Sequence, residues 1–138
     1  MAETTRRLIN PPSAPQPLGA YSLAAEASGS KLLFLAGQVS MDSSGNVIGH
    51  GDAAAQTRQV FENLGHVLAG AGATFNNVVE FTTYVVGRSS VQPFLQARGD
   101  IFPNIFPNGD YPINTLLIVD GLVREEFLIE VKAVAVLP

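Results

Sequence analysis

The sequence predicts an α+β domain in which two helices pack on one face of a mixed β-sheet. Two stretches, 52–71 and 91–102, have apolar residues at helical spacing, and the segments around them are β-branched or alternate in polarity. The resulting order is strands, helix, strand, helix, strands, which makes two βαβ-like halves. The face of the sheet without helices needs another cover, and a partner subunit is the simplest one.

The N-terminal segment is expected to be extended. Residues 1–19 contain four prolines, which disfavour helix and central strand, so we expect a short edge strand over 6–9 and then an arm. Two strand-like runs follow, over 21–27 and 31–36. The turn-forming residues between them, 28–30, predict that the two runs form a β-hairpin.

The middle of the chain contains the clearest elements. Apolar residues over 52–71 fall on one helical face, and Gly70 and Gly72 provide the end of the helix. These apolar residues are Val60, Phe61, Leu64, Val67, Leu68 and Ala71. Residues 78–86 are rich in valine and threonine and predict a strand, and residues 91–102 predict a second, shorter helix.

Two apolar strands are predicted near the C-terminus, over 111–119 and 127–136. Side chains along a strand alternate between the two faces of a sheet, so Glu130 and Lys132 share one face with apolar neighbours. Burying this carboxylate and this ammonium without partners would cost several kcal/mol. The two residues therefore mark either a polar cavity or a subunit interface.

The composition indicates one soluble domain over residues 1–138, with 46% hydrophobic residues to build its core. Only 14% of the residues are charged, below the roughly 25% of a typical domain, which favours an oligomer that buries part of its surface. The net charge of -4 and the scattered basic residues argue against a nucleic-acid partner. Apolar runs are too short to cross a bilayer and no leader opens the sequence, so we expect a cytoplasmic protein without membrane contact.

The sequence indicates no cofactor and no metal. It has no cysteine, which excludes disulfides, thiolate nucleophiles and cysteine metal sites. His50 lies in a glycine-flanked loop and His66 lies beside the apolar face of the first predicted helix. Neither histidine has a second metal ligand at a suitable spacing.

Four ordered segments carry a resemblance to a known family. They are Leu-Gly-Ala-Tyr at 18–21, Leu-Ala-Gly-Gln-Val at 35–39, the predicted helix over 56–68 and the strand over 129–136. Together they resemble the YjgF/RidA family of Rid proteins, which has also been labelled translation initiation inhibitor and L-PSP endoribonuclease. The resemblance implies a chorismate-mutase-like sandwich assembled as a homotrimer, with small-molecule ligands bound in clefts between subunits.

The resemblance also implies an activity. The best known members hydrolyse reactive enamines and imines, such as 2-aminoacrylate, to a keto acid and ammonia. Tyr21 matches the tyrosine of the family's cleft, Gly37 matches the glycine whose backbone amide meets the ligand, and Glu130 matches the glutamate that positions water. A carboxylate suits that role because it accepts the proton that the attacking water loses. Without the resemblance, Tyr21 would read as a strand aromatic with an exposed hydroxyl.

One position departs from the family pattern. Deaminase members carry an arginine that binds the substrate carboxylate through a bidentate salt bridge. The corresponding position in this sequence, two residues after Pro112, is Asn114. Asparagine donates a neutral hydrogen bond but brings no charge, so we expect an altered substrate range with weak binding of small anionic imino acids. Lys132 is a further candidate for ligand contact, and it either brings a cation to the cleft or pairs with Glu130.

We expect four strand residues to share a sheet face that turns toward a neighbouring subunit, with Tyr21 close to them. The four are Asn114, Leu116, Glu130 and Lys132. Two functions then compete. The first is an enamine or imine deaminase-type hydrolase with Glu130 as its catalytic residue.

The ligand-binding residues of this hydrolase would be Tyr21, Gly37, Asn114 and Leu116. The alternative function is a non-catalytic trimer that binds a small molecule, which Asn114 suggests because it lacks the charge of the arginine. A third reading, as a ribonuclease or translation inhibitor, is disfavoured by the acidic charge balance.

Overall fold

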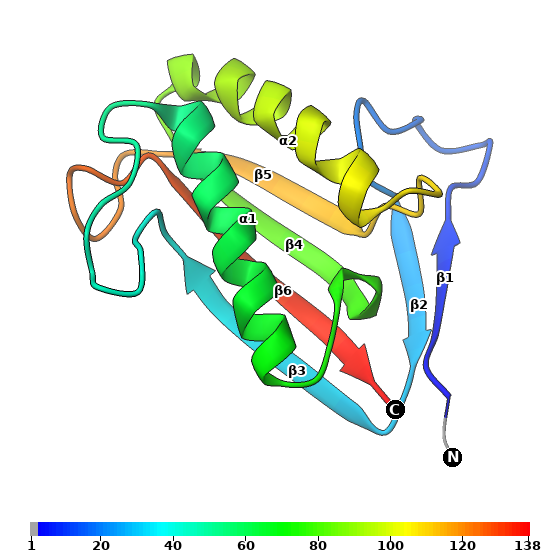
Figure 1. Cartoon of the computed structure of the whole chain (residues 1–138). Coiled ribbons are helices and arrows are strands. Elements are labelled where there is room, and N and C mark those ends of the chain that lie inside the picture. The colour runs from blue at the N-terminus through cyan, green and yellow to red at the C-terminus, as the bar shows by residue number, and fades with distance from the viewer. Residues whose placement is uncertain (1–2) are drawn as a thin grey trace.

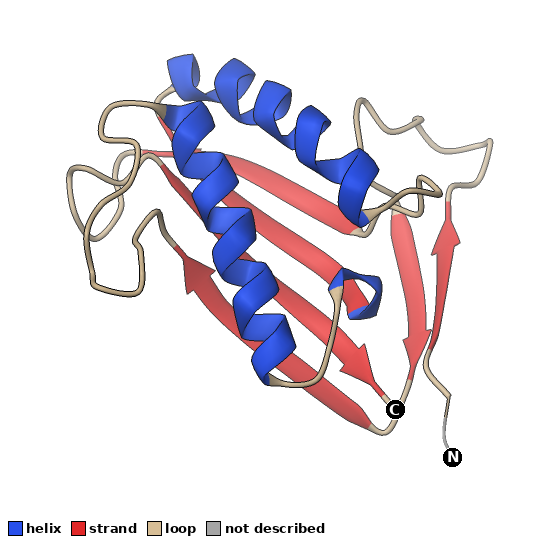
Figure 2. Ribbon diagram, viewed as in Figure 1, coloured by secondary structure: helices blue, strands red, loops and turns tan. Residues whose placement is uncertain are grey.

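The computed structural model describes residues 3–138 and confirms the predicted α+β class. Helices and strands separate into two layers (Figure 2). In chain order the elements are β1 (Thr5–Ile9), β2 (Ala24–Ser28), β3 (Lys31–Gln38), α1 (Ala53–Gly70), the 3-10 helix η1 (Phe75–Asn77), β4 (Val78–Val86), the 3-10 helix η2 (Arg88–Ser90), α2 (Val91–Ile105), β5 (Ile113–Val119) and β6 (Ile129–Leu137). The N-terminal edge strand, both helices and the strand at 78–86 therefore form where the sequence predicts them.

The main sheet has the strand order β3-β6-β4-β5, and α1 and α2 cross one of its faces (Figure 1). β4 pairs in parallel with β5 and antiparallel with β6, and β3 pairs antiparallel with β6. The sheet is therefore mixed, and β4 sets the register of both its neighbours. Because β4 pairs with both β5 and β6, its register determines which side chains of these two strands lie on the same face of the sheet.

The predicted hairpin over 21–36 is wrong. β2 pairs with β1 in a separate two-stranded sheet, and β3 pairs with β6. The short link between β2 and β3 lies against β6, because the Ser30 N–H donates to the Leu137 carbonyl at 3.0 Å. A Cβ on Gly29 would lie 2.6 Å from Cγ2 of Val136, so the link passes too close to β6 to carry a side chain at this position.

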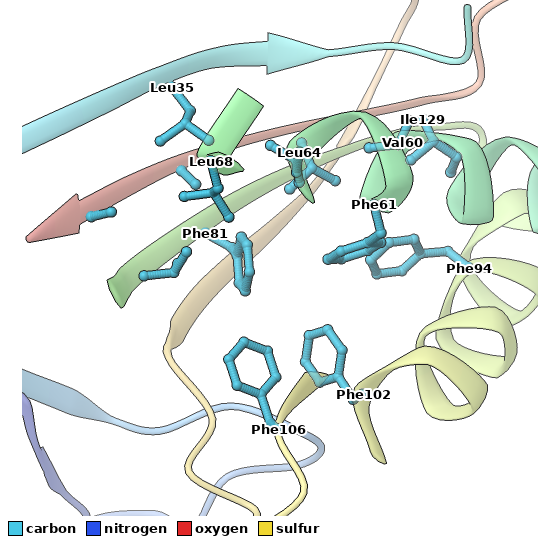
Figure 3. Close-up of a cluster of buried hydrophobic side chains, with 14 of the residues drawn as sticks. Leu35, Val60, Phe61, Leu64, Leu68, Phe81, Phe94, Phe102, Phe106 and Ile129 are labelled. Atoms are coloured by element: carbon cyan, nitrogen blue, oxygen red, sulfur yellow. The ribbon is translucent and has the colours of Figure 1, made fainter. Parts of the chain in front are cut away.

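The core lies between the helices and the sheet, and phenylalanine rings gather at its centre (Figure 3). Phe61 of α1 meets Phe81 of β4 edge to face with ring centroids 5.7 Å apart, and it meets Phe102 of α2 at 5.6 Å. Asp52 caps α1, where its carboxylate accepts a hydrogen bond from the Ala55 N–H at 3.0 Å. The ring contacts of Phe61 join α1 to both β4 and α2 on the same side of the sheet.

The opposite face of the sheet has no helix over it within residues 3–138. It is nevertheless apolar, since Leu32 and Phe34 of β3 are 67% and 71% exposed and Leu117 of β5 is 44% exposed. An exposed apolar surface that spans several strands is typical of an interaction surface. We call this side of the sheet the open face.

Gln56 ties α1 to the loop that leads into β6. Its side chain is fully buried, and its Nε2 donates to the Glu126 carbonyl at 2.8 Å and to the Gly49 carbonyl at 3.1 Å. Its Oε1 accepts a hydrogen bond from the Leu128 N–H at 2.8 Å. One side chain thus satisfies three backbone groups and holds the start of the strand that carries Glu130.

The variant Gln56→Leu tests this link. Leucine keeps most of the side-chain volume but leaves three backbone groups without their partner, so we expect a loss of about 3 kcal/mol or more in the free energy of unfolding. Urea denaturation at one fixed protein concentration measures it. The control is Gln59→Leu, where the amide bonds only to Asn63 Oδ1 at 2.9 Å. Equal losses in the two variants would contradict the role of Gln56.

Candidate active site

A cavity of about 390 Å³ lies between the N-terminal arm, α2 and β5. Its volume is in the range of small-molecule sites. The main lining residues are Tyr21, Asn114, Leu116, Leu18, Leu95 and Arg98. The first three are predicted ligand-binding residues, so the structure brings this part of the predicted site together.

The arm that carries Tyr21 is tied to the start of β5. The Ser22 N–H donates to the Pro112 carbonyl at 3.2 Å, and the Ser22 hydroxyl donates to the Tyr111 carbonyl at 2.6 Å. The Tyr21 hydroxyl accepts a hydrogen bond from the Leu18 N–H at 3.1 Å. Its own O–H therefore remains available as a donor at the cavity.

Asn114 is held in place by β4. The buried Thr83 hydroxyl donates to the Asn114 Oδ1 at 2.8 Å. The amide nitrogen of Asn114 donates to no side chain or carbonyl within the described residues. With its oxygen engaged, Asn114 offers a ligand two N–H donors.

Glu130 and Gly37 lie against each other. β3 has a register shift between Leu35 and Gln38, and Gly37 falls within this irregular segment beside β6. A Cβ on Gly37 would lie 2.8 Å from Cδ and 2.9 Å from Cγ of Glu130, so the glycine makes room for the carboxylate. Glu130 is half-buried and forms no ion pair with any residue from 3 to 138.

Lys132 lies on the same face as Glu130, but the two form no ion pair in the described part of the chain. Lys132 is exposed and lines a hollow of about 400 Å³ together with Phe34 and Gly37. Of the two alternatives from the sequence, pairing with Glu130 is therefore not found within one chain. Contact between Lys132 and a ligand stays a prediction.

The prediction that four strand residues share one face is wrong. β4 fixes the faces of its two neighbours, since Asn114 pairs with Phe81 and Glu130 pairs with Tyr84. Phe81 and Tyr84 are three residues apart on one strand and point to opposite faces. Asn114 and Leu116 therefore lie on the helix-covered side, whereas Glu130 and Lys132 lie on the open face.

The sheet consequently divides the predicted site in two within a single chain. Tyr21 lies with Asn114 at the cavity, and Glu130 lies with Gly37 on the other side. Glu130 is not among the described residues that line the cavity of Tyr21. One chain therefore does not bring all of the predicted site residues together.

Arg98 is a site residue that the sequence analysis missed. It is 6% exposed, and its Cζ lies 5.5 Å from the ring centroid of Phe94 and 5.4 Å from that of Phe102. Burial lowers the pKa of its guanidinium, while the nearby Tyr111 and Tyr21 oppose this shift. The signal was present in the sequence, because positions 94, 98 and 102 recur on one face of a helix and place a lone arginine in an apolar stripe.

The polar groups of the candidate site are N–H and O–H donors around the cavity and the Glu130 carboxylate on the open face.

From residue 3 to residue 138, no three His, Asp or Glu side chains gather so that they could hold a metal ion. None of the helices in this part of the chain is both long and apolar enough to cross a membrane.

The variant Gly37→Ala tests the contact between Gly37 and Glu130. The atoms nearest to the new methyl group all belong to the flexible Glu130 side chain, so we expect the fold to persist and the Glu130 carboxylate to move away. A crystal structure of the variant shows the displacement, and a thermal melt checks that the fold is kept. An unmoved Glu130 carboxylate in the variant would contradict the contact described above.

Comparison with known proteins gives the family of the chain. The family model described as Endoribonuclease L-PSP matches residues 11–137. The RutC family protein slr0709 from Synechocystis is 33% identical over 97% of this chain and 98% of that protein. The 3-aminoacrylate deaminase RutC from Acinetobacter baylyi is 30% identical over 94% of this chain and 97% of that protein.

A solved structure agrees with these sequence matches. The crystal structure of YyfB from Yersinia pestis, described as a protein of unknown function of the Rid family, is 36% identical to this chain. It superposes with a TM-score of 0.86 and covers 96% of this chain and 98% of its own. The chain therefore belongs to the Endoribonuclease L-PSP family, which is the YjgF/RidA family of Rid proteins.

Proposed function

We propose that this protein hydrolyses enamine or imine metabolites, with Glu130 as the residue that positions and activates water. The observation that carries the proposal is the Glu130 carboxylate, which lies half-buried against Gly37 on an apolar sheet face and has no ion-pair partner within residues 3–138. An unpaired carboxylate in such a place costs free energy and is typical of a functional group. The deaminase activity named for the Acinetobacter relative supports the same reaction class.

The chemistry needs one group that handles protons. Glu130 accepts a proton from water while the water oxygen attacks the carbon of the protonated imine, whose nitrogen becomes an amine. Glu130 returns this proton to the amine nitrogen, and the C–N bond breaks with release of ammonia. The hydroxyl group then loses its proton to the Glu130 carboxylate, which leaves a carbonyl group. An enamine enters the same route after a proton is added to its carbon.

The assembly we propose is a homotrimer in which the open face packs against neighbouring subunits. Leu32, Phe34 and Leu117 supply the apolar surface that this contact would bury. Such packing would bring the cavity wall with Tyr21 from one subunit toward Glu130 of the next. Because the sheet separates these residues within one chain, the cleft between subunits is where they can meet.

A non-catalytic trimer that binds a small molecule is the second candidate. It is favoured by Asn114, which offers neutral donors where the deaminase pattern has a charged arginine. The ribonuclease reading is weaker, because a net charge of -4 and the absence of a basic stripe in the sequence suit a phosphate backbone poorly.

Hydrolysis can be measured by letting an amino-acid oxidase generate the imine in place and following the release of ammonia. We expect the unmodified protein to accelerate this release and Glu130→Gln to reduce the acceleration by roughly 100-fold or more, because glutamine cannot accept the proton. Glu125→Gln, an exposed loop position, is the matched control and should keep full activity. No acceleration by the unmodified protein across a panel of imines would favour the binding function instead.

The trimer is tested by sedimentation equilibrium. We expect a mass three times the 14.6 kDa of one chain. Phe34→Asp places a charge on the open face and should shift the protein to monomers, because burying that carboxylate without a partner is costly. Val123→Asp, on a residue that is 87% exposed in a loop, is the control and should leave the mass unchanged. A monomeric unmodified protein would contradict the proposed assembly.

A further inference from the structure

The Arg98 side chain is largely buried, and its guanidinium has no counter-charge within residues 3–138. Arg98 is 6% exposed as a residue, yet within residues 3–138 no Asp or Glu forms an ion pair with it. No buried side-chain nitrogen in this part of the chain lacks a hydrogen-bond partner, so the guanidinium nitrogens without a protein partner reach the cavity. Asp100, two residues further along α2, forms an ion pair with Arg58 instead, with its Oδ2 3.8 Å from the Arg58 Nη2. A cation that is largely removed from water is unfavourable without an anion nearby, so an anion bound in the cavity would stabilise this guanidinium.

The guanidinium reaches the cavity that Tyr21 and Asn114 also line. Its Nη2 would lie 3.3 Å from a Cβ on Gly19, which places the charged end of Arg98 at the N-terminal arm. Contacts with the rings of Phe94 and Phe102 hold the guanidinium in position. The charge is therefore held in a fixed orientation.

Three kinds of donor surround this cavity. They are the guanidinium fork of Arg98, the amide N–H groups of Asn114 and the hydroxyl of Tyr21. No acidic residue in the described part of the chain lines it. A planar fork with neutral donors beside it matches the two oxygens of a carboxylate.

We propose that Arg98 is the anion anchor of this cavity and that it binds the carboxylate of an imino or enamino acid. The inference rests on the proposed function for the class of ligand. It places the positive charge on α2 at residue 98 rather than on β5 at residue 114. Asn114 in place of an arginine then no longer implies that anionic substrates bind weakly.

The test compares an acid with its neutral analogue on the intact protein. Isothermal titration calorimetry measures the affinity for 2-oxobutanoate, an unreactive stand-in for an imino acid, and for its amide, 2-oxobutanamide. We expect the unmodified protein to prefer the acid by roughly 10- to 100-fold, as a charge-assisted hydrogen bond would give. Arg98→Met should abolish this preference, and Arg98→Lys should leave an intermediate one because it keeps the charge but loses the fork.

The control is Arg88→Met, since Arg88 is an exposed arginine outside this cavity and its loss should leave the preference unchanged. An unmodified protein that binds the acid no better than the amide overturns the proposal, and this comparison stands even if Arg98→Met does not fold. An Arg98→Met protein that folds and keeps the preference for the acid also overturns it.

The anchor and the proposed hydrolysis can fail separately, because binding of a 2-oxo acid needs no catalysis. An acid preference that depends on Arg98, found together with no hydrolysis, would contradict the hydrolase and support the anchor. Hydrolysis that depends on Glu130 but is unchanged in Arg98→Met would contradict the anchor and support the hydrolase.

Discussion

The one-sided covering of the four-stranded sheet is the constraint on which the rest of this structure depends. α1 and α2 bury the phenylalanine cluster against one face, and the open face keeps exposed apolar residues such as Phe34. Burial of that surface is favourable by roughly 25 cal/mol for each Å², so the open face is a strong candidate for contact between subunits. A polar group on this face, such as Glu130, then lies where a neighbouring chain can close a cleft around it.

The register of β4 with its two neighbours places the candidate site residues on opposite faces of the sheet. Asn114 pairs with Phe81 and lies toward the helices, whereas Glu130 pairs with Tyr84 and lies on the open face. The cavity side supplies cationic and neutral donors that suit the carboxylate end of a ligand. The open face supplies a carboxylate that suits water activation. Binding and proton transfer are thus assigned to opposite sides of one sheet.

Local patterns in the sequence were sufficient to predict part of the fold and part of the candidate site. The helices and β4 follow from apolar spacing, and Glu130 stands out as an acid in an apolar strand. The pairing of β2 with β1 could not be read locally, because neighbouring strands are chosen by contacts between distant segments. The faces of Asn114 and Leu116 depend in the same way on their register with β4.

Arg98 shows a different limit of prediction from sequence. Its place in an apolar helical stripe is visible in the sequence, but an arginine is usually assigned to solvent because its charge is costly to bury. Only the three-dimensional structure shows that its guanidinium meets the cavity of Tyr21 and Asn114. Long-range packing therefore decided both what was mispredicted and what was missed.

The central claim, that each site takes residues from two chains, is tested most directly by mixing two inactive variants. Glu130→Gln and Tyr21→Ala proteins are unfolded together, refolded as mixed trimers and assayed for imine hydrolysis. If a cleft combines Tyr21 of one subunit with Glu130 of another, about a quarter of the clefts in an equal mixture are intact, and activity returns in proportion. A mixture that is no more active than its parent variants would contradict the claim.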